Sequence, residues 1–106
     1  MIRVTMLYPA SDDSRFDFDY YLGTHLPLSE RLLADYGFTG YTIQRCVSDA
    51  RGNPPAYLCI THLNFRSLED FQKGMAAHGQ ELREDFSHYT NVAPVATVCE
   101  LVSPGV

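Results

Sequence analysis

The fold of this chain is decided by residues 39–65, TGYTIQRCVSDARGNPPAYLCITHLNF. Near both ends of this segment the side chains alternate with a period of two, which predicts strands over residues 39–47 and 56–65. Residues 48–55 between them are dense in residue types that favour turns. The segment therefore predicts two antiparallel strands joined as a hairpin.

A helix is predicted on each side of this hairpin. Ser67 is a typical N-cap, and the apolar residues after it recur at helical spacing, so we expect a helix over residues 67–86. Its apolar face consists of Leu68, Phe71, Met75, Leu82 and Phe86. Before the hairpin, helical spacing is found over residues 16–22 and 27–36, with Ser14 as the expected cap. Because proline disfavours helical geometry in the preceding residue, Pro27 predicts an interruption at residues 23–26, where His25 lies.

A further strand is predicted near each end of the chain. Residues 2–8 alternate with a period of two, and residues 92–102 form an apolar run in which Pro94 stands near the beginning, where strands tolerate proline. The predicted order is therefore β, α, β, β, α, β. Two right-handed crossovers in this order place both helices on one face of a four-stranded antiparallel sheet, the ferredoxin-like α+β fold. At 106 residues, we expect residues 1–106 to form one domain.

Composition excludes several classes of partner. A hydrophobic content of 45% suffices for a core without disulfides or a structural metal. A net charge of −5, with only eight scattered basic residues, argues against binding to nucleic acid or to an anionic membrane surface. The sequence has no apolar run that could span a bilayer and does not begin like a signal peptide, so we expect a cytoplasmic protein. The widely spaced Cys46, Cys59 and Cys99 predict reduced, buried thiols.

The strand patterns also predict a homodimer. If both helices cover one face of the sheet, the other face should carry polar residues. Apolar residues instead occur on both faces of the predicted strands 56–65 and 92–102. A second copy of the chain, related by a two-fold axis, would bury such a face. The alternative is that these short strands simply contain scattered apolar residues.

His25 is the leading candidate for chemistry because it lies at the expected interruption of the first helix. Tyr21 lies four residues before it, so a helical turn would bring the polar tips of the two side chains together. A neutral imidazole accepts a proton near pH 7, which makes His25 a candidate general base. The alternative is structural, with His25 bonding backbone groups that the interruption frees.

Other side chains are candidates for binding a small molecule. His62 lies in the middle of a strand and either points under the helices or forms a hydrogen bond in the core. Asp85, near the end of the second helix, is unfavourable for the helix dipole, which suggests that it either fixes the following turn or lines a pocket. Tyr20, Tyr41 and Tyr89 suit the lining of an apolar cavity with a few hydroxyls, or are ordinary core aromatics.

No pattern in the sequence indicates a cofactor. No two of the four histidines have the spacing of a metal site. A phosphate-binding loop, a dinucleotide fingerprint and a nucleophile elbow are likewise missing from the sequence. We therefore expect neither a metal nor a bound organic cofactor.

The stretch YYLGTHLPL at residues 20–28 resembles the Y-Y-x-x-x-H-x-P-L part of the signature of the EthD family, named for a protein linked to ethyl tert-butyl ether degradation. SLEDF at residues 67–71 and the stretch from residue 85 to residue 95 resemble the family's second helix and final strand. The resemblance runs over residues 2–101 and implies a dimeric α/β barrel, in which two ferredoxin-like sheets pack together. It also implies a site at the motif positions Tyr21, His25 and Asp85.

The resemblance leaves the reaction open. Family members are described as accessory to monooxygenase-driven degradation or loosely as reductases, and related dimeric barrels include cofactor-free monooxygenases, lactone isomerases and haem-binding enzymes. The first hypothesis is a cofactor-independent oxidoreductase or isomerase for a small hydrophobic or aromatic metabolite of a catabolic pathway, with His25 as general base and Tyr21 orienting it. The second is an accessory protein that binds such a compound for a partner oxygenase. The third is a haem-handling barrel with a histidine as axial ligand.

Overall fold

The computed structural model describes residues 1–103. In chain order its elements are β1 (Ile2–Pro9), α1 (Phe18–Tyr20), the π-helical turn η1 (Tyr21–His25), α2 (Leu26–Leu33), β2 (Phe38–Arg45), β3 (Tyr57–Phe65), α3 (Leu68–Glu84), the 3₁₀ turn η2 (Phe86–His88) and β4 (Val95–Glu100). The strands form one antiparallel sheet in the order β2-β3-β1-β4. The predicted ferredoxin-like α+β fold is confirmed, although β4 begins three residues later than expected. Within residues 1–103 no helix is long and apolar enough to cross a membrane.

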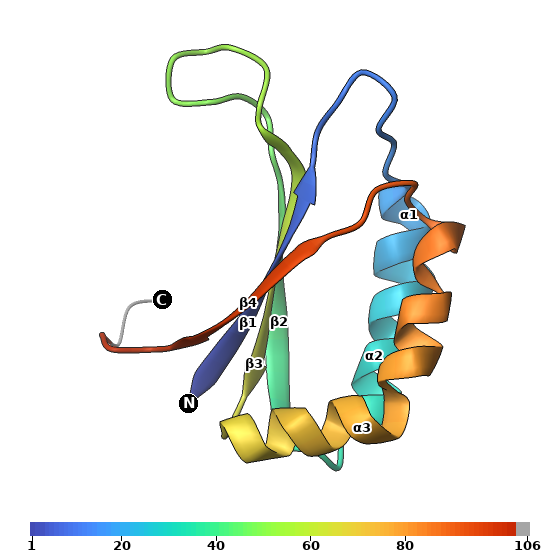
Figure 1. Cartoon of the computed structure of the whole chain (residues 1–106), viewed down its shortest axis with the longest axis vertical. Coiled ribbons are helices and arrows are strands. Elements are labelled where there is room, and N and C mark those ends of the chain that lie inside the picture. The colour runs from blue at the N-terminus through green and yellow to red at the C-terminus, as the bar shows by residue number, and fades with distance from the viewer. Residues whose placement is uncertain (104–106) are drawn as a thin grey trace.

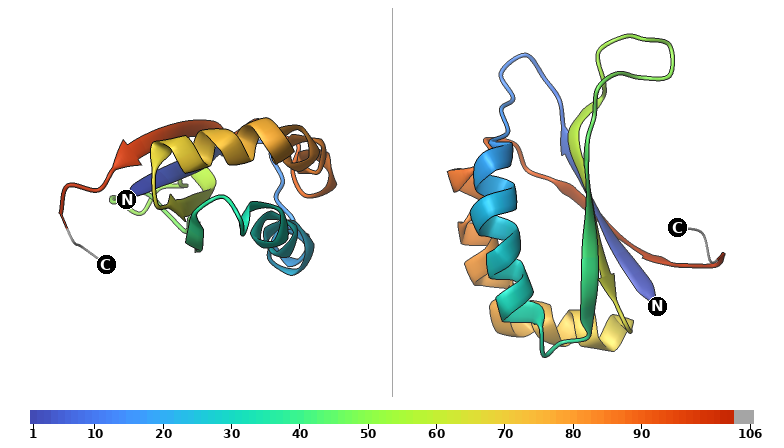
Figure 2. Two further views of the ribbon diagram at one scale, coloured as in Figure 1. Left: turned by 90° about the horizontal axis from the view of Figure 1, so that it is seen from below. Right: turned by 180° about the vertical axis from the view of Figure 1, so that it is seen from behind.

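The helices lie on one side of the sheet (Figure 1). The segment made of α1, η1 and α2 runs alongside the sheet, and α3 first passes across the end of the sheet and then turns to run beside α2 (Figures 1 and 2). The other side of the sheet has no helix against it (Figure 2, right). A cavity lies between the sheet and the paired helices.

The first helix is not interrupted, contrary to the prediction. The backbone stays in the right-handed helical region through Tyr21, His25 and Leu26, and the Leu26 N–H donates to the Tyr21 carbonyl, five residues back. A π turn of this kind fits one additional residue into a helix. Because Pro27 has no N–H to donate and its ring crowds the carbonyl four residues back, a widened turn just before it relieves the conflict. The proline thus perturbs the helix where expected, but by widening a turn.

The helix ends have identifiable causes. Asp17, and not the predicted Ser14, caps the first helical segment, because its side chain accepts from the Tyr20 N–H. Ser67 caps α3 as predicted, accepting from the Asp70 N–H. After α2, the chain turns at Gly37, whose φ of 71° lies in the left-handed region that glycine adopts without a steric cost.

We predict that Gly37→Ala lowers the free energy of unfolding by about 1–3 kcal/mol. A residue with a Cβ costs about 1–2 kcal/mol at this φ, and the added Cβ would also overlap the carboxylate of Asp70. Gly52→Ala is the matched control, because Gly52 has a φ of 85° but no atom within 4 Å of the added Cβ. Denaturant unfolding should show the larger loss for Gly37→Ala; equal losses would contradict the proposed clash.

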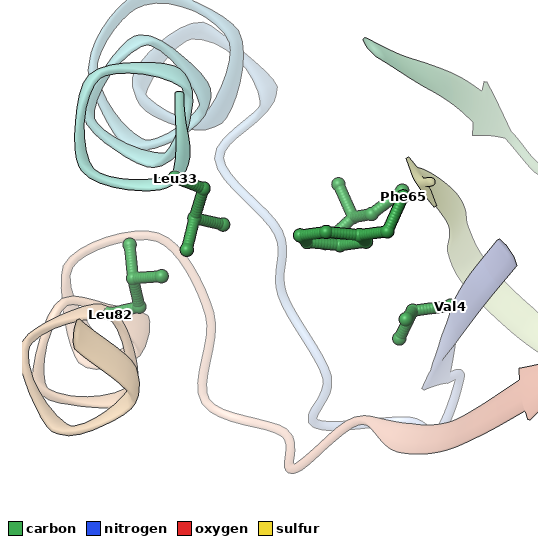
Figure 3. Packing of buried hydrophobic residues seen from close by; sticks show 5 residues of the cluster. Val4, Leu33, Phe65 and Leu82 are labelled. Carbon is green, nitrogen blue, oxygen red and sulfur yellow. The ribbon is translucent and has the colours of Figure 1, made fainter. Parts of the chain in front are cut away.

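Two clusters fill the space between the sheet and the helices. One joins the strand residues Val4, Leu63 and Phe65 to the helix residues Leu33 and Leu82. In Figure 3, Leu33 and Leu82 lie beside each other and face Val4 and Phe65 from the opposite side. The second cluster is largely aromatic and consists of Tyr8, Tyr21, Leu26, Cys59 and Tyr89. The predicted apolar face of α3 differs from the structure at both ends: Leu68 is exposed because it lies at the start of the helix, and Phe86 lies in η2, because α3 already ends at Glu84.

The face of the sheet that turns away from the helices is partly polar. Arg3 Nε donates to Asn64 Oδ1 at 2.9 Å, and Thr5 Oγ1 lies 2.9 Å from His62 Nδ1. Next to these pairs, the strand register places Leu7, Ile60 and Val95 side by side on the same face. We call these three residues the apolar band. Apolar residues therefore gather over one part of this open face.

The cysteines are only partly as predicted. Cys46, Cys59 and Cys99 are all free thiols, but Cys59 alone is buried and Cys99 is exposed. Burial raises the pKa of the Cys59 thiol to about 11. Cys99 is exposed because it lies on the edge strand β4, in register with Arg3 on the face of the sheet that turns away from the helices. The prediction of buried packing residues is thus wrong for Cys99.

Candidate functional site

The π turn η1 directs Tyr21 and His25 into the molecule. The two residues are 1% and 5% exposed, and their rings stack with centroids 5.4 Å apart and planes 12° from parallel. The polar tips do not meet, however. The Tyr21 hydroxyl lies 2.6 Å from Thr61 Oγ1 on β3, so Tyr21 supports the face of the imidazole and not its nitrogen atoms.

Asp85 is the polar partner of His25. Nδ1 of His25 lies 2.8 Å from Oδ2 of Asp85, and Oδ1 of Asp85 accepts from the Tyr20 hydroxyl, also at 2.8 Å. These two bonds offset the unfavourable position of a carboxylate at the C-terminal end of α3. Because an ionised carboxylate only accepts hydrogen bonds, Nδ1 carries the hydrogen, and Nε2 of the neutral ring is left with a free lone pair.

The surroundings of His25 favour the neutral imidazole. Burial lowers the pKa of His25 below its ordinary value of 6.5, and the hydrogen bond to Asp85 and its charge oppose this shift only in part. The hydrogen bond to Asp85 raises the pKa of Tyr20, so the phenol stays protonated and donates. Burial likewise raises the pKa of Tyr21 and of Tyr89. At neutral pH the basic nitrogen of the cluster is therefore Nε2 of His25.

A cavity of about 390 Å³ lies between the sheet and the helices, and His25 is one of its lining residues. The sheet contributes Val4, Met6, Leu63 and Ala96 to its wall. The other polar lining residues are Ser29, whose hydroxyl donates to the His25 carbonyl at 3.0 Å, and Arg83. Within residues 1–103, Nε2 of His25 forms no hydrogen bond. The cavity thus combines an apolar wall with one available basic nitrogen, and its volume is typical of small-molecule sites.

The structure gathers only some of the predicted site residues. The centroid of the Tyr89 ring lies 4.7 Å from that of the His25 ring, whereas the Tyr89 hydroxyl bonds the Tyr8 hydroxyl at 2.8 Å. Tyr89 therefore packs against the imidazole with its ring and forms no hydrogen bond to it. Tyr41 lies on the edge strand β2, 37% exposed, and His62 lies on the open face of the sheet. One cluster therefore contains Tyr20, Tyr21, His25, Asp85 and Tyr89. Tyr41 and His62 lie outside it.

Three residues at the site were not recognised from the sequence: Ser29, Thr61 and Arg83. For Arg83 a signal exists, because Met75, Gly79 and Arg83 follow each other at steps of four on α3 and all line the cavity. Thr61 occupies a core position of β3 and is recognisable only once Tyr21 is placed against it. In the part of the chain that the structure describes, no group of three or more His, Cys, Asp or Glu residues could hold a metal ion.

Fold and site together define a ferredoxin-like α+β protein with an apolar cavity beside a buried histidine. The family model of the EthD domain matches residues 11–93. The crystal structure of an EthD-like protein from Ralstonia eutropha JMP134 is 32% identical, with a TM-score of 0.90 over 98% of this chain and 94% of that chain. The chain therefore belongs to the EthD family.

More distant solved structures share the fold alone. One is a mutant of SnoaB, described as a cofactor-independent oxygenase, from Streptomyces nogalater, with 9% identity and a TM-score of 0.62 over 96% of this chain and 92% of that chain. Another is a dimeric ferredoxin-like protein from an uncultured marine organism, with 13% identity and a TM-score of 0.59 over 100% of this chain and 99% of that chain. No curated protein has a significantly similar sequence.

Proposed function

We propose that this EthD-family protein binds a small, largely apolar molecule in the cavity and removes a proton from it with Nε2 of His25, without a bound organic cofactor. The observation that carries the proposal is that the two nitrogen atoms of the His25 ring have different surroundings. Asp85 holds Nδ1, while His25 lines the cavity and Nε2 has no hydrogen-bond partner within residues 1–103. A positioned, neutral imidazole in an apolar site is a general base suited to neutral pH.

The chemistry of this step is proton transfer. A C–H next to a carbonyl group, or a phenolic O–H, loses its proton to Nε2, and the electron pair stays on the ligand as an enolate or phenolate. Asp85 stabilises the imidazolium that forms, since it already accepts from Nδ1. The stacked ring of Tyr21 keeps the imidazole in its plane. Return of the proton to another atom of the ligand completes an isomerisation that needs no redox partner.

Deuterium exchange tests this proposal without knowledge of the natural ligand. 2-Tetralone is a suitable first probe, because it is apolar, small and enolisable. We expect the protein in D₂O to exchange the activated C–H of 2-tetralone faster than an equal concentration of free imidazole does, as followed by proton NMR. A panel of enolisable ketones and unsaturated lactones extends the search. Probes that bind saturably and exchange no faster than with imidazole would refute the role of His25 as a general base.

An accessory binding protein is the second candidate, and the same cavity favours it. Such a protein would hold an apolar compound for a partner oxygenase, and the wall of Val4, Met6, Leu63 and Ala96 would suffice for that role. The exchange experiment separates the two candidates. Tight binding with no exchange by any member of the panel supports the accessory protein, whereas exchange that depends on His25 supports the enzyme.

We further propose that the protein forms a homodimer through the open face of its sheet, as the sequence predicts. Two observations support a second copy as the partner. Leu7, Ile60 and Val95 form an apolar band on a face that no helix covers, with Val95 55% exposed. In addition, the fold is shared with a protein described as dimeric. An exposed apolar band of this kind is typically buried by a partner.

Val95→Glu should convert the dimer to a monomer, because it places a charge in the apolar band. Val98→Glu is the matched control, since Val98 lies on the same strand, is 43% exposed and faces the helix side in register with Val4. Light scattering after size exclusion should give a dimeric mass for the wild type and for Val98→Glu, and half that mass for Val95→Glu. A wild-type protein that stays monomeric at high concentration would disprove the dimer.

A further inference from the structure

We propose that Arg83 makes the cavity selective for ligands whose apolar body carries a carboxylate. This inference deepens the proposed function by naming its ligand class. Arg83 lies in the last turn of α3 and is the only lysine or arginine among the residues that line the described cavity. Apart from His25 and Ser29, the remaining lining residues are apolar or glycine.

The guanidinium of Arg83 has no partner of its own. In residues 1–103 it forms no ion pair and no side-chain hydrogen bond, although acidic residues lie close by in sequence. Glu84 accepts instead from Gln80 at 3.0 Å, and both oxygens of Asp85 are engaged by Tyr20 and His25. The positive charge of Arg83 is therefore available to a ligand.

Gly79 provides the space that this guanidinium occupies. A Cβ added at Gly79 would lie 2.8 Å from Nη1 and 3.5 Å from Cζ of Arg83. The guanidinium therefore lies against the helix backbone at Gly79, one turn before Arg83, where the missing side chain leaves room for it. Because Gly79 and Arg83 both line the cavity, this arrangement keeps the guanidinium at the cavity wall.

A carboxylate is the chemical group that suits such a cation. The planar guanidinium offers two parallel N–H donors that match the two oxygens of a carboxylate. Arg83 is exposed to solvent, so water screens part of the attraction, and the paired N–H donors account for the preference for a carboxylate. The chain as a whole carries a net charge of −5, so its overall field does not attract anions. Selectivity for an acid therefore has to come from a local group such as Arg83.

Paired probes that differ only in charge test this inference. 2-Naphthoate and 2-naphthamide have the same apolar body and nearly the same shape. We expect wild-type protein to bind 2-naphthoate about 2- to 10-fold more tightly than 2-naphthamide in a fluorescence titration, because Arg83 is exposed and its ion pair is partly screened. Arg83→Gln should remove this preference, whereas Arg31→Gln, on the exposed side of α2, should keep it. Equal affinities for the two probes, or no binding of 2-naphthoate, would overturn the inference.

Gly79→Ala provides a second test that leaves the charge in place. The new methyl group would displace the guanidinium, which is the far end of a flexible side chain, so the fold should tolerate it. Alanine also favours a helix interior over glycine, and we expect an equal or higher Tm. The preference for 2-naphthoate should nevertheless fall. A preference that survives in Gly79→Ala and in Arg83→Gln would show that another group binds the carboxylate.

The two proposals fail separately. His25→Ala removes the proposed base but leaves Arg83 and its glycine in place, so the preference for 2-naphthoate should persist. A wild-type protein that shows deuterium exchange but no preference for 2-naphthoate would refute the role of Arg83 alone. A wild-type protein that prefers 2-naphthoate but shows no deuterium exchange would refute only the role of His25 as a general base.

Discussion

His25→Ala should lower the rate constant for deuterium exchange of a bound ketone by about 10²- to 10⁴-fold, the usual contribution of a positioned general base. The reason is geometric as well as chemical. His25 is the one lining residue of the described cavity with a nitrogen that accepts a proton near pH 7. The other polar lining residues, Ser29 and Arg83, carry a neutral hydroxyl and a permanent cation, which accept protons poorly. No other side chain at the wall can take over the reaction.

Two further variants separate loss of the base from loss of structure. His25→Gln keeps an N–H that can donate to Asp85 but has no basic nitrogen, so it should be as inactive as His25→Ala while retaining more of the wild-type stability. His78→Ala removes a histidine on α3 that does not line the cavity, and it should exchange at the wild-type rate. An active His25→Gln would show that another group removes the proton.

The fold follows from local sequence patterns. Period-2 strands and the heptad-like apolar spacing of α3 predict the order of the elements, and chain connectivity then restricts the topology. The form of the first helix did not follow, because Pro27 is compatible both with a break and with a widened turn. The choice between them depends on the packing of Tyr21 and His25 against β3 and Asp85, which lie far away in sequence.

The site is only partly predictable for a related reason. Alternation shows which strand residues share a face, but it does not show which face the helices cover. His62 alternates with buried residues and was therefore a reasonable candidate, but it lies on the open face, bonded to Thr5. The partners His25 and Asp85 are separated by 60 positions in the chain, and no local pattern joins them. The position of Asp85 in the sequence nevertheless indicated a role, because a carboxylate at a helix C-terminus is unfavourable without a compensating hydrogen bond.

Asp85→Asn should reduce exchange by about 10²- to 10⁴-fold, although Asn has the same shape as Asp. Two effects act in the same direction. The imidazolium loses the carboxylate that stabilises it, and the amide can present an N–H to Nδ1, because the Tyr20 hydroxyl donates to the other oxygen in the wild type. An N–H donor facing Nδ1 places the hydrogen of the neutral ring on Nε2. In that tautomer the nitrogen available to the cavity is no longer basic.

The pH profile distinguishes this positioning role from a structural one. In the wild type the exchange rate should rise with pH as His25 loses its proton, with a midpoint below 6.5, because burial lowers the pKa of His25. Asp85 opposes that shift, so removing its charge should move the midpoint further down, and NMR titration of the imidazole should show the same displacement. Tyr20→Phe removes only the bond that holds Asp85, so its effect should be several-fold at most. A variant Asp85→Asn that keeps the wild-type midpoint and loses activity only through unfolding would show that Asp85 stabilises the fold without tuning the base.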